Sequence, residues 1–207
     1  MKLACSECAE PAPVADLFCA QCEGLLAFEA AAGIDTGALL ARLRERRQSN
    51  AHADRSGVWR YRELLPPVDA DRIVTLREND VPVYAAKAGA AYAGAAQLSY
   101  LHLGMNPTGS FKDAGMTVAL THAAAAGASV AVCASTGNTA ASMAAYAARA
   151  GLHAAVLVPA TGISESKVAQ TLDYGASVFA IDGDFDAALR TVRRLDPRRV
   201  AIVNSIN

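Results

Sequence analysis

The sequence predicts an α/β fold of three layers, in which a parallel sheet lies between helices on both of its faces. Two observations over residues 98–207 carry this prediction. Short apolar runs rich in β-branched residues alternate with longer Ala-rich stretches of helical spacing. Gly, Ser and Asp stand at the boundaries, where helices begin and end. Strands joined through helices of this length need crossover connections, and these produce a parallel sheet.

The expected elements follow one another regularly. Helix stops are expected at glycines and N-caps at short polar residues, namely Gly127, Gly151, Gly175, Ser164 and Asp184. Helices are expected at 111–126, 138–150, 165–174 and 185–195. Strands are expected before, between and after them, at 98–103, 129–134, 154–158, 177–181 and 200–203.

The chain before residue 98 has a different organisation. Residues 34–47 show the helical spacing of Leu and Ala, and the polar stretch 48–56 is expected to be a linker or loop. Trp59 and Tyr61 are expected to be packing residues. The chain therefore divides into a cysteine-rich segment at 1–30, a helix and linker that begin a larger domain at 31–97, and the α/β domain at 98–207.

Four of the five cysteines form two C-x-x-C pairs near the N-terminus, Cys5 with Cys8 and Cys19 with Cys22. Each pair forms a tight knuckle that aims two sulfurs at one point, and two knuckles complete the tetrahedral thiolate set that zinc prefers. We therefore predict a structural zinc site in a segment similar to a zinc ribbon. The alternatives are iron bound by the same four sulfurs, disulfide bonds, and free thiols that bind no metal.

Composition and charge exclude several classes of function. The net charge of −1 and the pI of about 6.4 show no excess of positive charge of the kind that binds nucleic acid or an anionic membrane. No apolar stretch approaches the roughly 20 residues of a membrane helix, and the N-terminus lacks a secretory signal. We expect a cytoplasmic protein without nucleic-acid or membrane partners.

Two Gly-containing turns each open an Ala-rich helical stretch. Residues 106–116 read NPTGSFKDAGM, and residues 135–142 read STGNTAAS. The first turn places Lys112 in the first turn of a helix, where the positive end of the macrodipole disfavours the charged amine, so Lys112 is a candidate nucleophile. The second turn follows an apolar strand and brings Asn138, hydroxyls and backbone amides to a strand's carboxyl end, where open parallel sheets bind ligands.

These two motifs resemble those of the pyridoxal-phosphate enzymes of fold type II, in the tryptophan synthase β-like family, and among them the threonine synthases most closely. The resemblance implies that Lys112 carries the cofactor, pyridoxal 5'-phosphate, as a Schiff base. It implies that Asn138 hydrogen-bonds the 3-hydroxyl of the pyridine ring and that Ser110 lies near the cofactor phosphate. Local hydrogen bonding is the other interpretation of Ser110.

The same resemblance implies a reaction of threonine biosynthesis. O-phospho-L-homoserine and water would give L-threonine and phosphate, with the freed Lys112 as general base. The small-molecule substrate would be held by its phosphate at Ser135, Thr136, Thr139 and Asn204. The alternative is that Ser135 and Thr139 only cap a helix and Asn204 only ends a strand. Some threonine synthases begin with a similar four-cysteine segment, and a complete protein would be a possible homodimer.

The sequence also departs from the threonine synthases. Where they carry a G-E-G-x-T-P-L run, residues 74–84 read VTLRENDVPVY, so only Glu78 and Pro82 agree. A cysteate synthase-like or threonine or serine dehydratase-like enzyme is therefore an alternative. The glycine-rich loop for the cofactor phosphate and the partner of the pyridine nitrogen are also missing. We expect a fragment that lacks most of the large domain and is inactive by itself, with a non-catalytic remnant as a further alternative.

Overall fold

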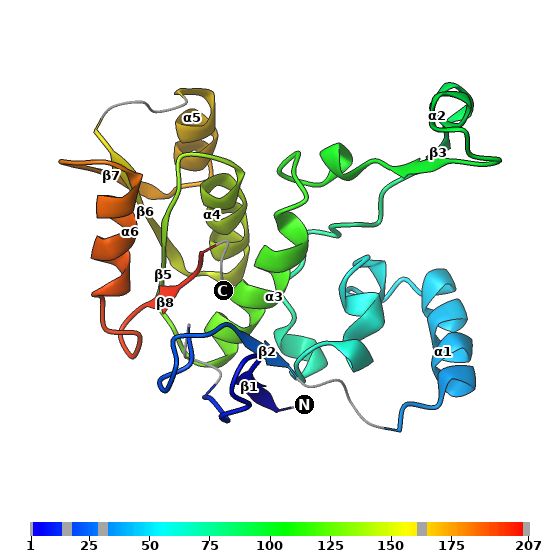
Figure 1. Ribbon diagram of the computed structural model, residues 1–207, viewed down its shortest axis with the longest axis horizontal. Coiled ribbons are helices and arrows are strands. Elements are labelled where there is room, and N and C mark those ends of the chain that lie inside the picture. Colours follow the sequence, from blue (N-terminus) through cyan, green and yellow to red (C-terminus); the bar gives the residue numbers. More distant parts are fainter. Residues whose placement is uncertain (1, 14–17, 29–32, 161–164, 205–207) are drawn as a thin grey trace.

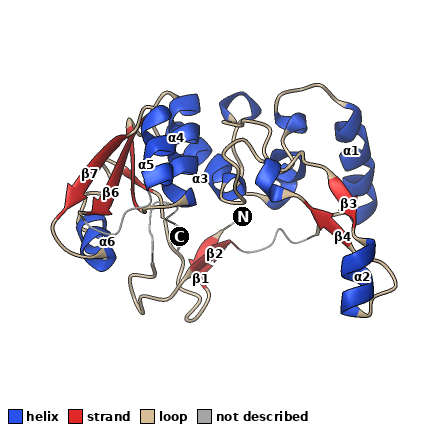
Figure 2. Cartoon of the chain, turned by 90° about the horizontal axis from the view of Figure 1, so that it is seen from above, coloured by secondary structure: helices blue, strands red, loops and turns tan. Residues whose placement is uncertain are grey.

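The computed structural model describes residues 2–13, 18–28, 33–160 and 165–204. Its main body is a four-stranded parallel sheet in the order β7-β6-β5-β8. Helices pack on both faces of this sheet, so the predicted α/β fold of three layers is confirmed (Figures 1 and 2). The strands are β5 (Val130–Ala134), β6 (His153–Pro159), β7 (Ser177–Ile181) and β8 (Ala201–Ile202).

Four helices accompany the sheet. One of its faces is covered by α4 and α5, with α3 packed against α4, and the opposite face is covered by α6 (Figures 1 and 2). The expected helix at 138–150 is confirmed to the residue, and the other three differ from expectation by one or two residues at their ends. Their bounds are α3 (Asp113–Ala125), α4 (Asn138–Ala150), α5 (Glu165–Asp173) and α6 (Phe185–Arg193).

Alternation along β5 explains how the two layers of helices are held. Cys133 faces the larger core with Met143 of α4, while the next residue on each side faces a smaller core with Val192 of α6. Successive side chains of a strand point to opposite faces, so a strand buried on both sides is apolar throughout. Burial raises the pKa of the Cys133 thiol to about 12, in keeping with a small core residue.

The strand expected at 98–103 does not join this sheet. Its central part is β4 (Ser99–Leu101), which pairs antiparallel with β3 (Val83–Ala85) in a separate two-stranded sheet. Figures 1 and 2 place this pair far from the parallel sheet. The prediction that this strand opens the parallel sheet is wrong, because an apolar pattern indicates a strand without choosing its partner.

The helix caps follow the sequence closely. Asp184 caps α6, since its side chain accepts a hydrogen bond from the Ala187 amide at 2.9 Å. Gly151 ends α4 in the left-handed conformation, with φ of 73°. The expected cap Ser164 lies outside the described residues.

The N-terminal half consists of helix α1 and several shorter elements. Trp59 is fully buried, and its Nε1 donates to the Thr117 hydroxyl on α3 at 2.8 Å, which fixes this half to the α/β body and confirms the expected packing role. The expected linker 48–56 includes a 3-10 turn. The elements are β1 (Leu3–Cys5), β2 (Leu26–Phe28), α1 (Thr36–Gln48), α2 (Lys87–Ala93), and 3-10 helices at Ala53–Arg55, Trp59–Leu64, Ala70–Arg72 and Leu103–Met105.

Within the described parts of the chain, no helix combines the length and the apolar character that crossing a membrane would require.

Candidate functional site

The turn before α3 is held by its own hydrogen bonds. Gly109 has φ of 74°, a conformation that glycine adopts without strain, and its amide donates to the Asn106 carbonyl at 2.8 Å. The buried Asn106 side chain donates from Nδ2 to the Ser110 carbonyl at 2.9 Å. The Ser110 hydroxyl in turn accepts from the Lys112 amide at 3.1 Å. The backbone of Lys112 is therefore fixed by the residues just before it.

Lys112 occupies the N-cap position of α3, because the helix begins at Asp113 rather than at residue 111. Its side chain is half-buried, and its Nζ lies 4.9 Å from the centroid of the exposed Phe111 ring. A cation at this distance from an aromatic face is weakly attracted to it. The amine is therefore placed at the start of a helix and is open to a reactant.

Asp113 joins this turn to helix α4. Its carboxylate is fully buried and accepts from the Thr108 amide at 2.9 Å and from the Thr108 hydroxyl at 2.5 Å. It also accepts from the Ser142 hydroxyl at 2.5 Å. Buried carboxylates are stable only when such donors surround them. The residue after Lys112 is thus bonded to the middle of α4.

A stripe of three polar residues runs along the otherwise Ala-rich helix α4. Asn138, Ser142 and Tyr146 are spaced by four residues and so lie on one face. Ser142 reaches Asp113, and the Tyr146 hydroxyl donates to Oε2 of Glu78 at 2.8 Å. Because Asn138 lies one turn before Ser142 on that face, the structure brings Asn138 to the side of α4 that holds the Lys112 turn.

The amide of Asn138 has an unusual environment. Its Oδ1 is buried and finds no hydrogen-bond partner among the described residues. Leaving a buried polar atom without a partner costs about 1–3 kcal/mol, so such atoms at a site point to a ligand group. An amide can present either its oxygen or its nitrogen at such a place. The site therefore fits a ligand that exchanges a hydrogen bond with Asn138.

The start of α4 is also open to a ligand. Its N-cap is Gly137, which has no side chain, and no side-chain cap is formed there. The Ser135 hydroxyl accepts from the Gly137 amide at 3.2 Å. This bond lies within the turn that precedes α4, so Ser135 does not act as the N-cap of the helix. Thr139 is buried in the first helical turn. Free amides and hydroxyls at a helix start form a site for an anion.

Asn204 lies beside this turn, although it is far away in the sequence. It lies two residues after the end of the final strand described, β8, and its Oδ1 accepts from the Ala134 amide at 3.3 Å. Ser135 and Thr136 line a small cavity together with Lys167 of α5. The carboxyl ends of β5 and β8 thus bring together the residues proposed from sequence for an anion.

Several polar residues at the site were missed by the sequence reasoning. Gln170 of α5 donates to the Thr108 carbonyl at 3.1 Å and accepts from the Lys167 amine at 3.1 Å. Ser142 and Tyr146 were also missed. Their spacing of four residues from Asn138 in an Ala-rich stretch is a signal that could have revealed the stripe.

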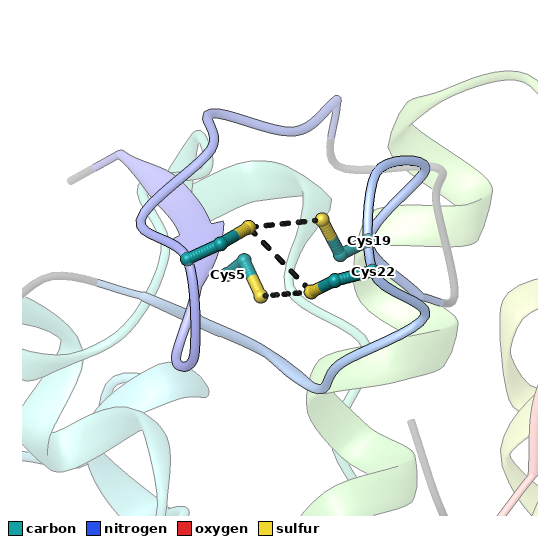
Figure 3. A group of neighbouring side chains, drawn as sticks. Cys5, Cys19 and Cys22 are labelled. Carbon is teal, nitrogen blue, oxygen red and sulfur yellow. Dashed lines mark hydrogen bonds between the residues drawn. The ribbon is translucent and has the colours of Figure 1, made fainter.

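The four N-terminal cysteines lie together in the structure. Their sulfurs are all within 4.8 Å of one another, and three of the pairs are 3.5 Å apart. A tetrahedron with metal–sulfur bonds of about 2.3 Å has edges of about 3.8 Å, close to these distances. Figure 3 shows the side chains of Cys5, Cys19 and Cys22 pointing toward one another.

The two knuckles repeat the same backbone pattern. In each, the amide two residues after the first cysteine donates to its sulfur at 3.4 Å, from Glu7 to Cys5 and from Gln21 to Cys19. In each, the fourth residue after that cysteine has a positive φ, 60° at Ala9 and 59° at Glu23. Backbone amides of Cys8 and Glu7 lower the pKa of the Cys5 thiol to about 7.

Gly24 leaves the room that the cluster needs. A Cβ at this position would lie 3.0 Å from the Cys5 sulfur and 3.2 Å from the Cys22 sulfur. Both distances are tighter than most real Cβ contacts, so a side chain here would push the sulfurs apart by a few tenths of an ångström, whereas glycine leaves them in place.

Comparison with known proteins identifies relatives of most of the chain. The sequence profile described as "Pyridoxal-phosphate dependent enzyme" matches residues 74–205. The chain is 48% identical to the threonine synthase of Synechocystis sp. over 162 residues, which are 77% of this chain and 42% of the relative. It is 46% identical to the threonine synthase of Methanocaldococcus jannaschii over 152 residues, 73% of this chain and 38% of that protein. The chain thus spans about two fifths of these relatives.

Solved structures agree with the fold. A pyridoxal 5'-phosphate-dependent aspartate racemase matches with a TM-score of 0.51 and 22% sequence identity, covering 59% of this chain and 39% of that chain. Identity at this level supports the shared fold alone.

Proposed function

The chain belongs to the family of pyridoxal-phosphate-dependent enzymes, and we propose that the protein acts as a threonine synthase. The substrate would be O-phospho-L-homoserine, which with water gives L-threonine and phosphate. The observation that carries this proposal is the similarity to curated threonine synthases over about three quarters of the chain.

Lys112 and Asn138 fit the cofactor best among the described residues. When bound, pyridoxal phosphate supplies a ring that accepts the electrons left behind as a proton departs from a substrate carbon. Lys112 would hold the cofactor through Nζ and, once released, would move that proton. The side-chain amide of Asn138, whose buried Oδ1 has no hydrogen-bond partner among the described residues, would hold the 3-hydroxyl of the ring. Ser110 would lie near the cofactor phosphate.

The open start of α4 would bind the phosphate of the substrate. Ser135, Thr136 and Thr139 would donate their hydroxyls, and the first amides of the helix would add the positive end of its dipole. Asn204 would close the site from the end of the neighbouring strand. Such preorganised donors also stabilise charge that develops on a departing phosphate.

The cysteine cluster would hold one zinc ion. Four sulfurs at near-tetrahedral spacing fill every coordination position, which is the arrangement of a structural rather than a catalytic zinc. Zinc would therefore stabilise β1 and the knuckles without taking part in the reaction.

Product analysis tests the proposed reaction. The full-length protein is incubated with pyridoxal phosphate and O-phospho-L-homoserine, and phosphate and threonine are measured together, with Lys112→Ala in the same protein as the control. Equal amounts of the two products, lost in Lys112→Ala, would support the proposal. Ammonia and a keto acid formed from threonine or serine, without turnover of the phosphorylated substrate, would instead indicate a dehydratase-like enzyme.

A further inference from the structure

The loop from Thr75 to Asn79 lies between the N-terminal half and the α/β body and has a strained backbone. Arg77 and Asn79 both adopt positive φ, 67° and 58°. Residues other than glycine rarely adopt this conformation, and they persist in it only where the surroundings fix them. The two residues differ in their side chains, because Arg77 is exposed whereas Asn79 is half-buried and bonded.

Glu78, between them, is the centre of a buried network. Its side chain is fully buried, and its carboxylate accepts from the hydroxyls of Ser56, Thr75 and Tyr146 and from the Leu76 amide. Tyr146 belongs to the polar stripe of α4, so this carboxylate fixes the loop to the same helix face that carries Asn138. Burial beside Glu78 raises the pKa of the Tyr146 phenol, which keeps the hydroxyl a donor.

Asn79 makes the second connection, to the Lys112 turn. Its amide donates to Oδ1 of Asn106 at 2.8 Å, and its Oδ1 accepts from Nδ2 of Asn106 at 3.0 Å. The same Nδ2 donates to the Ser110 carbonyl, two residues before Lys112. Asn79 and Asn106 thus form a two-bond amide pair that holds the first residue of the lysine turn.

We propose that Asn79 is a positioning residue, which with Glu78 fixes the Lys112 turn in register with the Asn138 face of helix α4. Glu78 holds the helix and Asn79 holds the turn, so the dipeptide spans the two halves of the candidate site. This inference rests on the proposed function for the role of Lys112. It assigns Asn79 no contact with cofactor or substrate.

The test compares two replacements by glycine in the same loop. Asn79→Gly keeps the backbone donor to Asn106 but removes the side-chain acceptor, whereas Arg77→Gly removes only an exposed side chain. Glycine adopts positive φ freely, so both variants relieve strain. Asn79→Asp retains an acceptor oxygen and serves as the conservative variant.

The measurement is the rate at which pyridoxal phosphate labels each lysine, trapped with borohydride and mapped by peptide mass spectrometry. We expect Asn79→Gly to lower the rate at Lys112 by about tenfold, since misplacing a reactive group costs rate steeply. The rates at Lys87 and Lys167 and the melting temperature should not fall. Arg77→Gly and Asn79→Asp should stay within about twofold of the unmodified protein at Lys112.

The possible outcomes distinguish failure of the positioning role of Asn79 from failure of the proposed role of Lys112. Preferential labelling of Lys112 in the unmodified protein, with an unchanged rate in Asn79→Gly, would overturn the positioning role alone. An unmodified protein in which Lys112 is labelled no faster than Lys87 would overturn the proposed function and this inference with it.

Discussion

The Ser142 hydroxyl donates a 2.5 Å hydrogen bond to the buried carboxylate of Asp113, and this bond joins the Lys112 turn to helix α4. Asp113 follows Lys112 directly, and Ser142 lies one turn after Asn138. The two sequence motifs are thereby connected through Asp113 and Ser142 rather than through Lys112 and Asn138, the residues proposed to hold the cofactor.

Ser142→Ala should therefore destabilise the fold. The variant removes one donor from a buried carboxylate, which costs about 1–3 kcal/mol in the free energy of unfolding. Urea denaturation measures the difference, and Ser177→Ala on the exposed edge of β7 is the matched control. Equal stability of the two variants would show that the bond to Asp113 contributes nothing.

Tyr146→Phe should have a comparable effect at the other end of the stripe. The variant keeps the packing of the ring but removes the donor to Glu78, so we expect a loss of about 1–3 kcal/mol. Tyr174→Phe is the control, since within the described part of the chain its hydroxyl makes one long contact, at 3.5 Å from Nε2 of Gln170. Thermal melting of both variants measures the difference. A melting temperature of Tyr146→Phe at or above that of the control would contradict a stabilising hydrogen bond from Tyr146 to Glu78.

The pH dependence of stability should reveal the contribution of the ion pair between Glu63 and Arg46. Two hydrogen bonds from Arg46, at 2.5 and 2.7 Å, lower the pKa of the Glu63 carboxyl to about 2. A depressed carboxyl pKa contributes stability that is present above the ordinary value of 4.5 and lost as the pH falls toward about 2.

Glu63→Gln should therefore make the decline in stability over that acid range shallower. The pH-dependent free energy of unfolding that is lost with the carboxylate should be about 1–2 kcal/mol, a figure lowered because Glu63 is partly exposed to solvent. Glu45→Gln, an exposed residue of α1, should leave the decline unchanged. Acid titration of the melting temperature measures both, and parallel curves for the two variants would refute the ion pair.

Gly24→Ala should weaken metal binding at the cysteine cluster. The added Cβ would press on the sulfurs of Cys5 and Cys22, so we expect affinity for zinc to fall on the order of tenfold. Competition with a chromogenic chelator measures the affinity. Gly115→Ala, where a Cβ meets no atom within 4 Å, is the control. An unchanged affinity in Gly24→Ala would contradict the geometry of the cluster.

The fold could be predicted from sequence where local signals are strong. The helix at 138–150 and the strand at 177–181 have clear periodicity and Gly stops, and both are confirmed. The strand at 98–103 was misplaced because its pairing with β3 is a tertiary choice that its own residues do not encode.

The candidate site could be proposed from sequence only in part. Lys112 and Asn138 stand in short motifs, whereas the bonds that bring them together connect residues far apart in the sequence. Glu78 reaches Tyr146, and Asn79 reaches Asn106, across distances along the chain that no local pattern reveals.

The most direct measurement is the position of the covalent label left after the protein is mixed with pyridoxal phosphate and reduced with borohydride. The account predicts a pyridoxyl group on Lys112 well above the level at Lys2, Lys87 and Lys167, and a marked decrease of that group in Asn138→Ala. A label spread evenly over the four lysines, unchanged by Asn138→Ala, would contradict it.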